Sequence, residues 1–163
     1  MNAPQMKRGG APVGHVAELD GIEAASVIYL RLWCDGPDGQ DSVSEDFAMG
    51  LGPENGAKAR DAFAELCRLC AHHGRRPMMR HGVSCKCLGA DEACFANFIG
   101  AAAQGASEDA MLIATLMVRA DFAPLVTALA ADVGQAFRMM NLRAPECMAG
   151  KDAPFYPPST TLH

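Results

Sequence analysis

Cysteine and histidine, the side chains that bind transition metals and carry thiol chemistry, gather in one short part of this sequence. Five of the seven cysteines and three of the five histidines lie between positions 67 and 94. The candidate ligands in this stretch are Cys67, Cys70, His81, Cys85, Cys87 and Cys94. A Cys-x-x-Cys pair followed by a second Cys/His group is a familiar way to supply the four ligands of zinc. A zinc-stapled helical domain is therefore one hypothesis.

The spacing of this cluster differs from that of paired zinc knuckles. Cys67 and Cys70 fall within a predicted helix rather than on a turn, and Cys85 and Cys87 are separated by one residue instead of two. Free cysteine is a small, commonly buried apolar group. Cys67, Cys70 and Cys94 lie on apolar stripes of predicted helices, where they would fill space. We therefore favour structural thiols and keep the zinc site as an alternative.

Thiol redox chemistry is a second alternative for the same segment. Residues 66–90 contain no acidic side chain. They carry five positive charges, at Arg68, Arg75, Arg76, Arg80 and Lys86. Cationic neighbours and a helix N-terminus make a thiol more reactive, and Cys87 closely precedes a helix predicted to start near Asp91. An exposed Cys85 or Cys87 would then be the most reactive thiol. The interpretation that we favour is instead that the basic segment docks on an acidic loop at residues 35–46, which leaves the thiols buried.

The elements that must position these side chains are predicted to be helices. Apolar residues recur at three- and four-residue steps, which is typical of amphipathic helices. Helices are expected over residues 22–33, 57–73, 91–102, 108–118 and 122–140, although a strand is an alternative for residues 22–33. Between the first two, residues 35–46 are expected to form an acidic loop, in which Ser42 or Ser44 caps a short helical turn that ends by Gly50 or Gly52. The fold class predicted is all-α, a compact bundle of four to six helices with a long Cys/His-containing connection and extended termini.

One of the predicted helices, residues 108–118, is apolar nearly all round. A helix without a polar face normally lies at the centre of a fold or in a subunit interface. Small residues at 101–103 and 130–131 would allow neighbouring helices to approach closely.

The chain is predicted to form one domain. It has 163 residues, of which 50% are hydrophobic and 20% charged, as is usual for a globular protein. We expect a mobile N-terminal arm at residues 1–15, a single helical domain at residues 16–141 and a proline-rich tail at residues 142–163, with Phe155 and Tyr156 as the large apolar groups of the tail.

Charge and motifs exclude several classes of function. The net charge of −5 argues against general affinity for nucleic acids or anionic membranes. A helix pair around Gly105 superficially looks like a helix-turn-helix, but its second helix begins Glu108-Asp109, which does not suit a DNA groove. No apolar run is long enough for a membrane span. No phosphate-binding loop, nucleophile elbow or zinc-protease motif is present.

The function predicted is that of a non-enzymatic protein that acts through protein–protein interaction or self-association. Its partner is expected to be another protein or a second copy of the chain, not DNA or a membrane, and no cofactor is expected. The absence of an apolar leader and the odd number of cysteines suggest a cytoplasmic location. The zinc-stapled domain and the thiol-based redox sensor are the alternatives.

Overall fold

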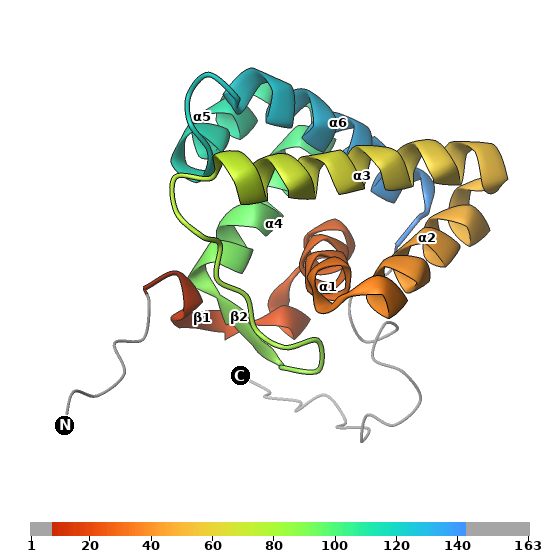
Figure 1. The fold of residues 1–163 in the computed structure, drawn as a ribbon, viewed down its shortest axis with the longest axis horizontal. Coiled ribbons are helices and arrows are strands. Elements are labelled where there is room, and N and C mark those ends of the chain that lie inside the picture. The colour runs from red at the N-terminus through yellow and green to blue at the C-terminus, as the bar shows by residue number, and fades with distance from the viewer. Residues whose placement is uncertain (1–7, 143–163) are drawn as a thin grey trace, which may run out of the picture.

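The described part of the chain, residues 8–142, folds into six α-helices and a two-stranded sheet in this computed structural model (Figure 1). The helices are α1 (Gly21–Asp35), α2 (Pro37–Leu51), α3 (Pro53–His73), α4 (Ala90–Ala103), α5 (Ser107–Met117) and α6 (Ala123–Met139). The strands are β1 (Pro12–His15) and β2 (Cys87–Gly89), and the 3-10 turns η1 (Arg8–Gly10) and η2 (Val16–Glu18) flank β1. The predicted all-α class is confirmed, including the helix predicted over residues 22–33. Of the predicted tail, only Leu142 lies within the described residues, so Phe155 and Tyr156 lie outside them.

The predicted acidic loop at residues 35–46 is wrong, because helix α2 begins at Pro37. Gly36 takes a φ of 128°, which glycine adopts without a Cβ clash, and so separates α1 from α2 by a single residue. Proline is favoured at the first position of a helix, where no N–H is needed. The apolar pattern of α2 is weak because the helix buries only Gly39, Val43 and Phe47.

The core is enclosed around α1, which Figure 1 shows nearly end-on among the other helices. Tyr29 of α1 makes edge-to-face contacts with Phe47 of α2 and Phe137 of α6, each with ring centroids 5.3 Å apart. Its hydroxyl donates a hydrogen bond to Asp46 Oδ2 at 3.2 Å. Burial, together with the charge and hydrogen bond of Asp46, raises the pKa of Tyr29 above its ordinary value. The tyrosine is thus held neutral as a core residue.

Helices α4 and α6 approach each other closely. A Cβ at Gly134 of α6 would lie 2.8 Å from Cα of Ala103 in α4, so the two backbones meet where one side chain is absent. The expectation that small residues permit close helix approach is confirmed at this crossing.

Helix α5 lies at the surface of the bundle rather than at its centre. Within this helix only Ala110 and Ala114 are buried. Leu112 and Leu116 are 65% and 72% exposed. The expectation that this helix lies at the centre of the fold is therefore wrong, and its exposed position leaves a subunit interface as the other place expected for such a helix. Among residues 8–142, no helix combines the length and the apolar character needed to cross a bilayer.

The long connection between α3 and β2 crosses from the α5 end of the bundle to the sheet (Figure 1). At its start, Arg75 N–H donates to the carbonyl of Met117 at 3.0 Å. At its end, β2 pairs antiparallel with β1, with His15 opposite Cys87. Residues 8–15, the described part of the predicted N-terminal arm, are therefore hydrogen-bonded to the main body through this strand pair.

Candidate functional site

A buried ion pair joins the first and fourth helices beneath the sheet. Arg31 of α1 is 2% exposed and Glu92 of α4 is 0% exposed. Arg31 Nε donates to Glu92 Oε1 at 2.7 Å and Arg31 Nη2 donates to Glu92 Oε2 at 2.8 Å. Two parallel bonds of this kind are the strongest way for a guanidinium to hold a carboxylate. Both charges are therefore fixed in one geometry.

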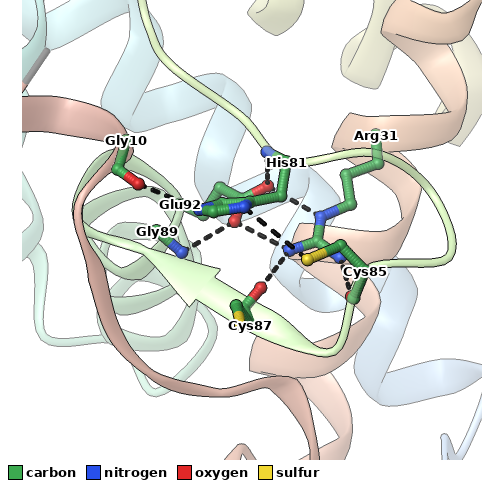
Figure 2. Close-up of polar contacts among 7 residues, drawn as sticks. All are labelled: Gly10, Arg31, His81, Cys85, Cys87, Gly89 and Glu92. Carbon is green, nitrogen blue, oxygen red and sulfur yellow. Dashed lines mark hydrogen bonds and ion pairs between the residues drawn. The ribbon is translucent and has the colours of Figure 1, made fainter. Parts of the chain in front are cut away.

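This ion pair also holds the backbone of the segment that contains the cysteines (Figure 2). Arg31 donates to the carbonyls of Cys85 and Cys87, each at 2.6 Å. Glu92 accepts the backbone N–H groups of His81 and Gly89, each at 2.9 Å. We call Arg31, Glu92 and these four backbone groups the hub. It fixes residues 81–89 as one unit.

The hub keeps Glu92 ionised. Burial alone would raise the pKa of this carboxyl group. The hydrogen bonds from Arg31 and from the N–H groups of Gly89 and His81 outweigh burial, and the pKa of Glu92 lies below its ordinary value. Because each charge has its partner and its hydrogen bonds, the pair satisfies the condition for a stable buried charge.

Sequence reasoning missed the hub. Arg31 stands in the mostly apolar stretch 22–33, and Glu92 stands in the first turn of the helix predicted to start near Asp91, where an acidic residue is favourable without any partner. A lone arginine among buried positions was the available signal, because arginine is rarely buried without a partner.

The hub places two of the predicted site residues against each other. Cys85 Sγ lies 3.6 Å from His81 Nδ1, and His81 Nε2 lies 3.0 Å from the carbonyl oxygen of Gly10 (Figure 2). Because a carbonyl only accepts, His81 Nε2 must carry a proton. In the neutral imidazole, Nδ1 is then the acceptor that faces the thiol. A nucleophile, a base and a group that orients the base thus stand in the order typical of an activated cysteine.

Three of the helix thiols lie in a different environment. Cys67 and Cys70 of α3 are each 8% exposed. Burial raises the pKa of Cys67 well above its ordinary value and that of Cys70 to about 12. Burial and the charge of Asp91 raise the pKa of the half-buried Cys94, with Arg76 opposing. These three thiols stay protonated and pack as small apolar groups, as expected of structural cysteines.

The six predicted ligands do not converge on one point. Within residues 8–142, no three His, Cys, Asp or Glu side chains are grouped so that they could hold a metal ion. Of the six, the structure joins only His81 and Cys85 by a hydrogen bond. Cys87 is half-buried in β2, and its carbonyl rather than its thiol takes part in the hub.

The surface beside the thiol–imidazole pair is hollow and lined by charged side chains. A pocket of about 270 Å³ lies next to His81. It is lined by Arg31, Asp35, Arg80, His81, Gly82 and Val83. Neither Arg80 nor Lys86 forms an ion pair with a side chain of the described chain. The predicted docking of the basic segment on an acidic loop is wrong: that loop is helix α2, and Arg76 pairs with Asp91 of α4 instead.

This geometry stands without support from related proteins. Comparison of the chain with protein-family models, with curated proteins and with solved structures finds no match.

Proposed function

We propose that the protein is a thiol-based redox sensor in which Cys85 is the reactive group. The observation that carries this proposal is the contact between Cys85 Sγ and His81 Nδ1, with the far nitrogen of the ring bound to Gly10. The proposal replaces our preference for purely structural thiols at this one position. Cys67, Cys70 and Cys94 keep their structural role.

The chemistry proposed is exchange with a low-molecular-weight disulfide. His81 Nδ1 takes the proton of the Cys85 thiol, and the thiolate attacks one sulfur of the disulfide. A new bond forms between Cys85 Sγ and that sulfur while the disulfide bond breaks, and the second sulfur leaves as a thiolate. His81 returns the proton to this leaving group, so the ring ends neutral. The disulfide is reduced and Cys85 is oxidised to a mixed disulfide.

The charges around the pair favour an anionic disulfide. Arg80 and Lys86 are both exposed and flank the segment of His81 and Cys85 in sequence. Positive charge near the reacting sulfur stabilises a thiolate and attracts anions. At the pocket the charge of Arg31 is neutralised by Glu92, and Arg80, whose Nη2 donates to the Cys34 carbonyl at 3.0 Å, stands with the opposing charge of Asp35.

A mixed disulfide at Cys85 would disturb the hydrogen bonds of the surrounding backbone. The adduct would compete with His81 for the space at Sγ, and the His81 ring is the group that binds Gly10. The Cys85 carbonyl is at the same time bound to Arg31. Modification of one side chain is therefore coupled to residues 81–89 and to the N-terminal segment, which is the local change that a sensor needs.

The test is site-resolved mass spectrometry of the native protein treated with oxidised glutathione. We expect Cys85 to acquire the glutathione adduct before any other cysteine. Replacement His81→Gln should slow this reaction at least about tenfold, because the base is lost. Replacement His72→Gln, which alters an exposed histidine of α3, is the matched control and should leave the rate unchanged. The neutral 2-hydroxyethyl disulfide should react more slowly than the anionic one.

Two results would contradict the proposal. The first is an adduct formed preferentially at Cys34, the exposed cysteine of α1. The second is an equal rate at Cys85 in the wild-type protein and in the His81→Gln protein. Circular dichroism of each variant separates loss of the base from loss of the fold.

A further inference from the structure

Helix α5 presents an apolar stripe to the outside. Leu112 and Leu116 lie one turn apart on the same face and are 65% and 72% exposed. Single exposed leucines are ordinary, but adjacent ones that continue into an apolar hollow are typical of an interaction surface. Within residues 8–142, no segment covers this pair.

A hollow of about 360 Å³ adjoins the stripe at Leu116. Its wall is formed by Val13, Ala90, Ala93, Cys94, Asn97, Ile113 and Leu116, of which only the asparagine is polar. The hollow and the two leucines thus form one continuous apolar surface, which we call the α5 face.

The charges along α5 indicate what covers this face. Glu108 and Asp109 stand in its first turn, and Arg119 follows its last turn. The leucines lie between an acidic end and a basic end. A second copy of α5 packed antiparallel would place each acidic end against the basic end of the other copy. A parallel copy would oppose like charges, so the pattern is self-complementary only in the antiparallel arrangement.

We infer that the protein forms a symmetric dimer through the α5 face. The two-fold axis passes midway between Leu112 and Leu116 on the exposed side of α5, so that Leu112 of one copy faces Leu116 of the other and Asp109 of one copy faces Arg119 of the other. An interface of this kind uses the same patch on both copies and closes on itself. Leu112 of each copy then lies at the rim of its partner's hollow.

The existing partner of Arg119 does not prevent this arrangement. Arg119 pairs with Asp121 at 2.9 Å, but both side chains are more than half exposed. An exposed pair of this kind is weakly held because water and salt screen it, so exchange for Asp109 of a second copy costs little. The inference is independent of the redox proposal, since no residue of the hub or of the thiol–imidazole pair takes part.

Sedimentation velocity over the micromolar range tests the inference on the whole chain. We expect a reversible monomer–dimer equilibrium for the wild-type protein. Leu112→Glu and Leu116→Glu should each weaken it at least about tenfold, because a buried anchor becomes a charge. Met49→Glu, on the distant and 86% exposed Met49 of α2, is the matched control and should have no effect.

Charge reversal separates the proposed register from other dimers. Asp109→Arg and Arg119→Glu should each weaken the dimer, and the double variant should restore it, because the pair is rebuilt with opposite signs. A monomer at every concentration would overturn the inference. So would a dimer insensitive to Leu112→Glu, or a double variant no tighter than the single ones.

Discussion

At the scale of single residues, the conformation of residues 81–89 depends on one buried charge pair. Arg31 and Glu92 satisfy each other and four backbone groups of residues 81–89. Removing one partner of a buried pair leaves the other charge without compensation in an apolar surrounding. The structure therefore makes Glu92 far more important for stability than any acidic residue at the surface.

We predict that Glu92→Gln lowers the free energy of unfolding by about 3–5 kcal/mol at neutral pH, because Arg31 stays buried without a counter-charge. Urea denaturation measures this value. Glu65→Gln removes an exposed pair with Arg68 and is the control, with little change expected. Comparable losses in both variants would contradict a special role for the hub.

The destabilisation caused by Glu92→Gln should depend on pH. The pKa of Glu92 is lower in the folded protein than its ordinary value, so the unfolded chain binds its proton first as the pH falls. The stabilisation by this group is complete above its unfolded pKa of about 4.3 and is lost as the pH falls through the lower folded value. The difference in unfolding free energy between wild type and Glu92→Gln should therefore shrink in acid. A constant difference would show that Glu92 is not ionised in the folded state.

At the scale of elements, close backbone packing sets how α4 and α6 lie against each other. The α4–α6 crossing depends on the missing side chain at Gly134. We predict that Gly134→Ala destabilises the protein by about 1–3 kcal/mol, because the new methyl group meets the backbone of Ala103. The matched control is Gly100→Ala in α4, where the new Cβ would lie 3.5 Å from the flexible Glu23 side chain. Thermal unfolding should show a lower Tm for the first variant and an equal or higher Tm for the second.

Most elements could be predicted from the sequence, because apolar periodicity is a local property. Helices α1, α3, α4, α5 and α6 follow from it. Helix α2 was missed because it buries only one residue per turn. The surface position of α5 was also missed, because an all-apolar helix does not say which of its faces has a partner.

The candidate site was only half predictable for a different reason. The cysteine–histidine cluster is visible in the sequence, but Arg31 and Glu92 lie 61 residues apart, and His81 and Gly10 lie 71 apart. His81 and Cys85 are four residues apart in a non-helical connection, where no periodicity predicts contact. Only the fold selects this pair from the many that the cluster allows.

At the scale of the whole molecule, the thiol–imidazole pair exists only when distant segments meet. The N-terminal segment supplies Gly10, α1 supplies Arg31, α4 supplies Glu92, and the connection supplies His81 and Cys85 (Figures 1 and 2). The reactivity of Cys85 should therefore depend on the folded state and on His81, and should not follow from exposure. The decisive comparison is Cys85 itself with and without His81, because burial raises the pKa of the Cys34 thiol although Cys34 is an exposed residue.

The most direct measurement is the alkylation rate of each cysteine with iodoacetamide, resolved by mass spectrometry in native protein and in urea. We predict that Cys85 of the native wild-type protein reacts at least about tenfold faster than Cys85 of the native His81→Gln protein, and that this difference disappears in urea. If instead Cys85 reacts at the same rate in both native proteins, or if Cys34 reacts first although burial raises its pKa, then His81 does not activate Cys85.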